Sequence, residues 1–338
     1  MREELLVSGR MNAGVDPQLH VWGWEIAVYL FLGGLAAGLL IYAAWFWLMG
    51  KKKELPVTVS IAPLLVPVLL ILGLMALFID LRHKLFFWQL YTTIRLQSPM
   101  GWGAWTLMIV TPLSIIWASM QLKTLYPVLD FNNKFIKPIQ LIISHQSDNP
   151  VMNWDWKFKW VRNLENFLQQ NFKTFSRIVL IYSIILGIYT GILLSAFNAR
   201  PLWNTSILGF LFLASGLSTA AAVIMLMSKS HEERRLFSKI DLVMIVIELF
   251  LIIHIFMGFL ASTQVQISAA YLFLGGPYTL VFWIFVVFLG LVLPAFLEIL
   301  ELKGNTIPVL IPAALVLIGG LILRFVIVYA GQASRYLY

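Results

Sequence analysis

Residues 26–49 read IAVYLFLGGLAAGLLIYAAWFWLM, an apolar run without a charged side chain. A helix of about 20 such residues crosses the roughly 30 Å hydrocarbon core of a bilayer. Further runs of this length follow along the chain, and none shows the alternating pattern of an outer-membrane β-barrel. The sequence therefore predicts an all-α integral membrane protein. We expect about eight transmembrane helices, at 21–49, 57–80, 101–122, 175–197, 205–227, 240–262, 278–300 and 306–330.

The composition agrees with a chain embedded in lipid, and it limits the chemistry of that chain. Of the 338 residues, 60% are hydrophobic and 12% are charged, whereas about a quarter are charged in a soluble domain. The chain has no cysteine, which excludes disulfides, iron–sulfur ligation, c-type haem attachment and thiol chemistry within it. Any iron–sulfur cluster that serves this protein must be held by a partner.

The distribution of Lys and Arg predicts the orientation. An even number of helices puts both termini on one side, and that side holds seven basic residues against sixteen on the other. Because basic loops stay in the cytoplasm, we expect both termini in the periplasm of a prokaryotic cytoplasmic membrane. The net charge of +8 is thus attributed to membrane orientation and not to nucleic acid. The first twenty residues lack an apolar core with a cleavage site, so we expect no cleaved signal peptide.

The spacing of the apolar runs divides the chain into three parts. We expect two four-helix bundles, one formed by 21–122 with 175–204 and the other by 205–330. The long loop 123–174 between them falls on the cytoplasmic side. It mixes basic with aromatic residues, which is typical of a helix at the lipid headgroups, and a surface that docks a partner is the alternative. Its aromatic residues include Trp154, Trp156, Phe158, Trp160 and Phe167.

Small residues recur in the first and fifth helices. Residues 31–38 read FLGGLAAG, and residues 212–221 read FLASGLSTAA. This similarity suggests a weak four-plus-four internal repeat. Gly34 and Gly38 lie one turn apart and allow a neighbouring helix to approach closely.

Polar residues inside a membrane are costly, so each one is a functional candidate. On the first helix, three- and four-residue spacing places Trp22, Glu25, Ile26 and Tyr29 on one face near the outer end. This face combines aromatic, acidic and hydroxyl groups at the depth where the helix enters the membrane.

Other helices carry polar or aromatic residues toward the same side. Asp80 ends the second helix, Trp102 starts the third and Tyr189 lies near the end of the fourth. Arg324 lies about 18 residues along the last helix, which at about 1.5 Å per residue is near the outer face. The structural alternative is an aromatic belt with charges that snorkel or pair.

Several motifs resemble one known family. They are Trp22-x-Trp24 before a Gly-rich helix, SPMGWGAW at 98–105, YTGILL at 189–194, RPLWN at 200–204, and Gly319-Gly-x3-Arg324 with YAGQ at 329–332. Together they look like the NrfD/PsrC family, the membrane subunits of polysulfide reductase and related respiratory complexes. The resemblance covers the first five helices and the last one, which is nearly the whole chain.

The resemblance implies a subunit that binds menaquinone or ubiquinone, holds no haem or iron–sulfur cluster, and is not catalytic alone. It implies a ferredoxin-like iron–sulfur partner and often a molybdopterin catalytic subunit, in addition to membrane lipid. The quinone headgroup is then expected in the first bundle, near the start of the first helix and the YTG motif. Tyr189 matches the tyrosine that contacts quinone in the family. Ile26 and Tyr29 stand where the polysulfide reductase type has Asn and His.

Quinone chemistry independently needs groups of these kinds. A quinone gains two electrons and two protons, so its site needs hydrogen-bond donors, apolar walls and an ionisable relay to water. Tyr29 and Tyr189 are candidate donors, and Glu25 or Asp80 is the candidate relay. The candidate walls are Trp22 and Trp102.

Two ionisable residues fall near the middle of the expected sixth helix, Glu248 and His254. They are candidates for a proton track from the inner side, although their side chains point about 120° apart. The structural alternative is a helix-packing His hydrogen-bonded to a carbonyl and a Glu close enough to the interface to be hydrated. His254 is also the one histidine within an expected span, whereas a b-type haem needs two facing histidines, so haem and intramembrane metal are disfavoured.

Two further questions stay open at this point. Asp80 and Arg324 lie at similar expected depth, and they either form an ion pair or are hydrated separately. A secondary transporter and a purely structural anchor are the alternative functions. A transporter should show polar segments near the midplane, whereas the first, third, fourth and fifth helices are apolar there.

Overall fold

A computed structural model describes residues 22–125, 144–146 and 154–334. Within these residues there are 8 helices long and apolar enough to cross a membrane. They span Trp24–Leu48, Val57–Asp80, Pro99–Leu125, Phe172–Ser195, Ile207–Met227, His231–Leu260, Val281–Leu302 and Leu310–Ala333. The prediction of an all-α, multi-pass membrane protein is confirmed.

The sixth spanning helix, α9 (His231–Leu260), differs most from the sequence-based expectation, because it begins nine residues before position 240. Its added turns are polar, so an apolar window does not register them. Ser230 caps the helix by accepting a hydrogen bond from the backbone N–H of Glu233 at 3.5 Å. The earlier start places every later residue of α9 deeper along the helix than expected.

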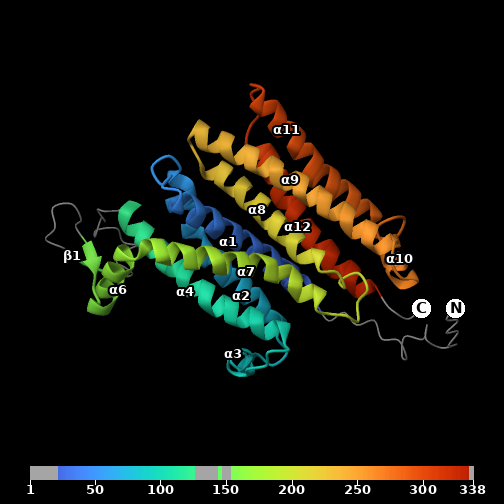
Figure 1. Cartoon of the computed structure of the whole chain (residues 1–338), viewed down its shortest axis with the longest axis horizontal. Helices are drawn as coiled ribbons and strands as arrows, with labels where there is room; N and C mark the ends of the chain where they lie inside the picture. Colours follow the sequence, from blue (N-terminus) through green and yellow to red (C-terminus); the bar gives the residue numbers. More distant parts are fainter. Residues whose placement is uncertain (1–21, 126–143, 147–153, 335–338) are drawn as a thin grey trace.

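The spanning helices pack in two groups (Figure 1). The first group contains α1 (Trp24–Leu48), α2 (Val66–Asp80), α4 (Pro99–Leu125) and α7 (Phe172–Ser195). The helical turns η1 (Val57–Ile61) and η2 (Ala62–Leu65) extend α2 toward its N-terminus. The second group contains α8 (Ile207–Met227), α9, α12 (Leu310–Ala333) and the continuous helix of η4 (Val281–Val292) with α11 (Leu293–Leu302). The two groups meet where α1 and α7 pack against α8, and where α1 packs against α12.

Glycines set the closest crossing between the groups. A Cβ added to Gly38 of α1 would overlap the backbone carbonyl of Gly216 on α8. A Cβ added to Gly216 would lie 2.6 Å from the carbonyl oxygen of Gly34. The close approach expected at Gly34 and Gly38 is therefore present, and the neighbour is the helix with the similar small-residue pattern.

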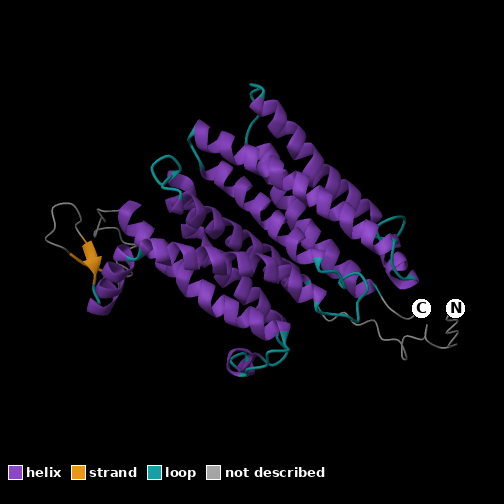
Figure 2. Cartoon of the chain, in the orientation of Figure 1, coloured by secondary structure: helices purple, strands orange, loops and turns teal. Residues whose placement is uncertain are grey.

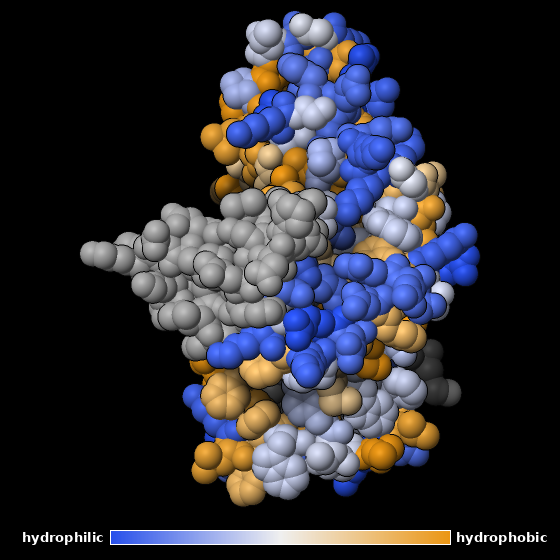
Figure 3. Space-filling model, turned by 90° about the vertical axis from the view of Figure 1, so that its left-hand side faces the viewer, coloured by the Kyte–Doolittle hydropathy of each residue, from blue (hydrophilic) through white to orange (hydrophobic). Residues whose placement is uncertain are grey.

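Short elements connect the spans at either end of the molecule. At the end where α1 begins lie η3 (Lys84–Phe86), α3 (Gln89–Thr92) and α10 (Gln264–Tyr271). At the opposite end lie α6 (Lys159–Gln170) and an antiparallel strand pair, β1 (Ser144–Gln146) with β2 (Trp154–Trp156) (Figure 2). Following the expected orientation, we call the α10 end outer and the α6 end inner. Seen from the inner side, the molecule shows a broad hydrophilic band (Figure 3).

The long inner loop is more than a single interfacial helix. Trp154 and Trp156 lie in β2, and Trp154 is buried, so neither belongs to a helix at the lipid surface. Lys123 at the end of α4 binds the loop through two hydrogen bonds. Its Nζ donates to Asp155 Oδ1 and to Glu165 Oε2, each at 2.8 Å. Trp160 and Phe167 lie in the amphipathic helix α6.

Candidate functional site

Two tyrosines of different helices lie together near the outer end of the first group. Tyr29 is five residues into α1, and Tyr189 is six residues before the end of α7, so both are about 8 Å from their helix ends. Their side chains are buried, with 3% and 7% exposed, and they lie within electrostatic reach of each other. Neither hydroxyl forms a hydrogen bond within the described residues. The site therefore holds two hydroxyl groups without protein partners.

Glycines make room for both rings. A Cβ added to Gly103 of α4 would overlap the Tyr189 hydroxyl and ring. Gly73 of α2 lies against Tyr29, where an added Cβ would be 3.6 Å from Cδ2 of that ring. Any side chain at position 103 would displace Tyr189, so the SPMGWGAW motif contributes space to this site.

Two carboxyl groups lie nearer the outer ends of their helices than the tyrosines do. Glu25 at the start of α1 and Asp80 at the end of α2 are both partly exposed, and their charges are close enough to interact. Of the residues expected at a quinone site, the structure thus pairs Tyr29 with Tyr189 and Glu25 with Asp80, and Glu25 lies about one turn from Tyr29 on α1. A pair of carboxyl groups between water and the buried hydroxyls can take up or release protons.

Tyr91 joins this cluster, although the sequence did not single it out. It lies in α3 within electrostatic reach of Tyr29, and its backbone carbonyl accepts a hydrogen bond from Trp105 Nε1 at 3.2 Å. Partial burial raises the pKa of the Tyr91 hydroxyl above its ordinary value. The segment between α2 and α4 has no helical or strand periodicity, so its aromatic content was the one available signal.

Three other expected residues lie elsewhere or point elsewhere. Trp22 precedes α1, and its ring packs on Phe197 and Trp203 at centroid distances of 4.8 and 5.1 Å. Its backbone N–H and carbonyl both pair with the Gln332 side chain of α12 at 2.9 Å, so it joins the two groups of helices. Trp102 is 51% exposed and donates to the Leu96 carbonyl. Ile26 is fully buried in the core, one turn before Tyr29.

Arg324 lies deeper than its sequence position suggested. Its helix begins at Leu310 and ends at Ala333, so Arg324 is about 14 Å from the outer helix end. Its guanidinium donates to Ser215 Oγ, to the Gly320 carbonyl at 3.0 Å and to the Phe212 carbonyl at 3.1 Å. Its Cζ also lies 4.8 Å from the centroid of the Phe212 ring.

Arg324 and Asp80 do not pair. The ion pairs formed within 22–125, 144–146 and 154–334 include none between them. Asp80 interacts with Glu25, whereas Arg324 interacts electrostatically with Glu248 of α9. The two residues belong to different helix groups, and Arg324 is fully buried, whereas Asp80 is partly exposed.

Glu248 is part of a row of buried carboxyl groups in the second helix group. Because α9 starts at His231, Glu248 is about 25 Å from the inner helix end and near the middle of the helix. Asp241 lies two turns closer to the inner end on the same face, and Glu298 of α11 interacts with Asp241. All three are at most 2% exposed.

Ser218 of α8 connects this row. Its hydroxyl donates to Asp241 Oδ1 at 2.5 Å, and it also interacts with Glu248. Asp241 Oδ2, Glu248 Oε1 and both Glu298 carboxyl oxygens are buried without hydrogen-bond partners in the described protein. A cavity of about 10 Å³ beside Ser218 and Glu248 has room for roughly one water molecule. The row runs from Glu298 near the inner end to Glu248 at mid-depth.

His254 is not part of this row. Its side chain is exposed on the surface of α9, its Nδ1 lies 3.0 Å from the Phe250 carbonyl, and its ring packs on Phe250. Glu248, by contrast, faces the interior. In the described part of the protein, no group of three or more His, Cys, Asp or Glu side chains is arranged to hold a metal ion.

The fold and these features define a multi-pass membrane protein with a hydroxyl and carboxyl cluster in one helix group and buried acids in the other. The family described as polysulphide reductase, NrfD, matches residues 13–334, and the chain belongs to this family. Protein NrfD of Escherichia coli K12 is 29% identical over 328 residues, which cover 93% of this chain and 96% of the relative. The C subunit of polysulfide reductase from Wolinella succinogenes is 31% identical over 326 residues, covering 92% and 94%. The Protein NrfD homolog of Haemophilus influenzae is 29% identical, covering 93% and 95%.

Proposed function

We propose that this protein is the membrane subunit of a respiratory oxidoreductase complex and binds menaquinone or ubiquinone between Tyr29 and Tyr189. The observation that carries the proposal is the pair of buried tyrosine side chains whose hydroxyls have no hydrogen-bond partner within the described residues. Hydroxyl groups of buried side chains are usually hydrogen-bonded, so two unpartnered donors within electrostatic reach of each other favour a ligand with acceptor oxygens. Quinone carbonyl oxygens are such acceptors.

The residues around the tyrosines have separate roles in this proposal. The bound quinone supplies the two-electron, two-proton chemistry. Tyr29 and Tyr189 orient its carbonyl groups, and Gly103 leaves the space that the Tyr189 ring occupies. Glu25 and Asp80 lie partly in water and exchange protons with the site.

The electrons must pass to or from a partner, because this protein has no cysteine to hold an iron–sulfur cluster. The outer loop between α2 and α4 supports a docking site for such a subunit. It exposes large apolar side chains, and exposed apolar patches commonly mark protein interfaces. Its exposed residues include Leu85, Phe86, Phe87, Trp88, Ile94 and Leu96. We infer an iron–sulfur subunit there, with a molybdopterin or other catalytic subunit beyond it.

We also propose that protons enter from the inner side through the second helix group. Glu298, Asp241 and Glu248 form the route, with Ser218 between the last two. Carboxyl groups with unpaired oxygens in a low-dielectric interior can hold and pass protons. This route takes the place of the proton track through Glu248 and His254, because the His254 side chain is exposed on the surface of α9 and does not face the protein interior.

Electron transfer in the assembled complex tests the main proposal. Replacing Tyr189 by Phe removes one hydroxyl and keeps the ring, so quinone turnover should fall without loss of assembly. Tyr182→Phe on the same helix is the matched control, because Tyr182 lies about two turns nearer the inner end. A purely structural anchor would show normal turnover in both variants.

A further inference from the structure

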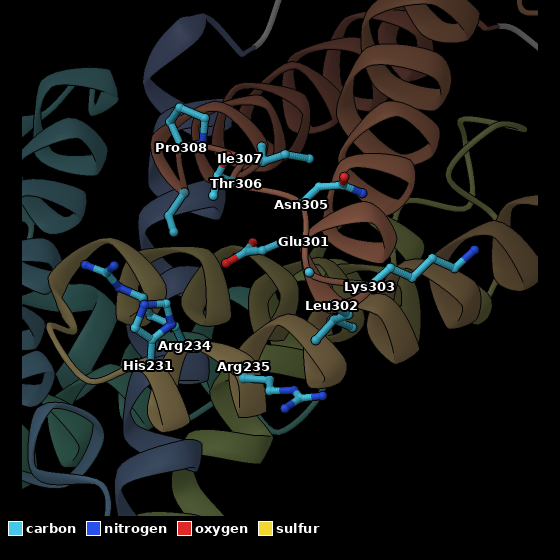
Figure 4. A pocket seen from close by; sticks show the side chains of 12 residues that line it. His231, Arg234, Arg235, Glu301, Leu302, Lys303, Asn305, Thr306, Ile307 and Pro308 are labelled. Atoms are coloured by element: carbon cyan, nitrogen blue, oxygen red, sulfur yellow. The ribbon is translucent and has the colours of Figure 1, made fainter.

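A pocket of about 690 Å³ opens at the inner end of the second helix group, apart from the site described above. Its volume lies within the range of small-molecule sites. One wall is the first turn of α9, with His231, Arg234 and Arg235, and the opposite wall is the segment from Glu301 to Val309 that joins α11 to α12. Figure 4 shows His231 and Arg234 across the pocket from Thr306, Ile307 and Pro308, whereas the Arg235 side chain points away from these three residues.

The pocket carries an excess of positive charge. Arg234, Arg235 and Lys303 supply three positive charges against the one negative charge of Glu301. None of the three cations forms an ion pair in the parts of the chain that the structure describes. Arg234 Nε donates to the Ser228 carbonyl at 2.6 Å, which fixes the guanidinium beside the pocket. Lys303 extends toward the far edge, away from the two arginines (Figure 4).

Two helix N-termini add to this potential. α9 begins at His231 and α12 begins at Leu310, so the positive ends of both helix dipoles lie at the pocket. The first turn of α9 holds two acidic residues, neither in the pocket lining: Glu233 accepts hydrogen bonds from Thr58 N and Oγ1 at 2.8 and 2.6 Å, and Glu232 is exposed. The pocket is therefore suited to an anion.

The lining also contains the polar residues Asn305 and Thr306, and its apolar part continues into the lipid-facing surface. Leu302, Ile307, Pro308 and Val309 line the pocket, and the next residues, Leu310 and Ile311, are exposed on a membrane-spanning helix. A free anion needs no such surface, whereas a phospholipid places its phosphate at this kind of boundary between charge and hydrocarbon. We propose that the pocket binds the phosphate headgroup of an anionic phospholipid of the inner leaflet, with its acyl chains along α12.

Lipid binding to the purified full-length protein in uncharged detergent tests the proposal. Native mass spectrometry would compare phosphatidylglycerol with phosphatidylcholine, which shares the phosphate but has no net charge. We expect phosphatidylglycerol to bind at least about tenfold more tightly. The variant Arg234→Gln with Arg235→Gln should lose about fivefold per charge, the equivalent of about 1 kcal/mol for each.

Control variants separate the pocket from general surface charge. Lys229→Gln with Lys239→Gln removes two exposed charges at the same end of the molecule outside the pocket lining, and it should change binding less than twofold. Since Arg234 also contacts Ser228, Arg235→Gln with Lys303→Gln provides a second test on exposed side chains. Equal losses in the pocket and control variants would overturn the proposal. Displacement of the lipid by millimolar inorganic phosphate would overturn it too and assign the pocket to a free anion.

Discussion

Glu248 of α9 and Arg324 of α12 lie within electrostatic reach of each other near mid-depth of the second helix group, and both are buried. Their surroundings are small and hydroxyl-bearing, because Ser215 and Gly320 lie beside the guanidinium. A buried charge is tolerated when an opposite charge and hydrogen bonds compensate it. The pair thus joins the inner row of acids to the contact between the two helix groups.

The pairing of these two residues predicts energetic coupling. Arg324→Gln should destabilise the protein by about 3–5 kcal/mol, since it leaves Glu248 without its cation. The double variant with Glu248→Gln should be more stable than the sum of the single effects by about 0.5–3 kcal/mol. Denaturation in detergent would measure this. Asp80→Asn combined with Arg324→Gln is the control and should be additive; coupling there in place of Glu248 would contradict the assignment.

The close crossing of α1 and α8 predicts that alanine substitution destabilises the protein at one glycine, Gly38, and not at another, Gly258. Gly38→Ala should destabilise the protein by about 1–3 kcal/mol, because the added methyl group overlaps the Gly216 carbonyl. Gly258→Ala on α9 is the matched control, since an added Cβ there meets nothing within 4 Å. Thermal unfolding in detergent would compare the two. Equal melting temperatures would argue against a close helix contact at Gly38.

The helices and this crossing could be predicted from the sequence, because apolar length and small-residue spacing are local properties. Tyr29 and Tyr189 could also be predicted to share an end of the bundle. Trp22 could not be placed, since Gly23 is extended and α1 starts at Trp24, so Trp22 does not follow the helical spacing that relates Ile26 and Tyr29. Which way a side chain faces depends on packing between helices, which one sequence does not contain.

The burial of the acidic residues in the second helix group could not be predicted from the sequence. Asp241 and Glu298 fall near the ends of the expected spans at 240–262 and 278–300, where hydropathy does not show that a side chain is buried. The helices that carry them begin at His231 and end at Leu302, beyond the apolar windows, so both residues are inside the protein. For the same reason Glu248 lies near mid-depth. Polar turns that extend a helix leave no hydropathy signal.

The row of acids predicts proton uptake from the inner side. In proteoliposomes that contain the assembled complex, Glu248→Gln, Asp241→Asn and Glu298→Gln should each slow inner-side proton uptake by roughly tenfold or more. His254→Ala should have no effect, because His254 is exposed on α9. A pH-sensitive dye inside or outside the vesicles would report uptake. Normal uptake in the three carboxyl variants would leave Glu25 and Asp80 as the proton source.

The hydrogen bonds between Lys123 and the inner loop predict that the loop becomes less stable at acid pH. Burial alone would raise the pKa of Asp155, but hydrogen bonds from Lys123 and from the Trp156 backbone hold it below the ordinary value of 3.8. A lowered pKa means that the ionised group stabilises the loop above about pH 4, and that this contribution is lost as the pH falls further. The protection of residues 154–170 against hydrogen exchange, measured relative to the intrinsic rate at each pH, should therefore decrease below that pH. Lys123→Met should produce the same exposure at pH 7, and unchanged exchange in this variant would refute the contact.

Quinone binding at Tyr189 is the central claim, and the affinity of the assembled complex for a quinone or a quinone-site inhibitor measures it most directly. Losing one hydrogen bond from the Tyr189 hydroxyl should weaken binding about tenfold, or about 1.4 kcal/mol. The account predicts this loss for Tyr189→Phe, with an affinity within twofold of the unmodified complex for Tyr182→Phe. Equal affinity in the Tyr189→Phe and unmodified complexes would contradict it.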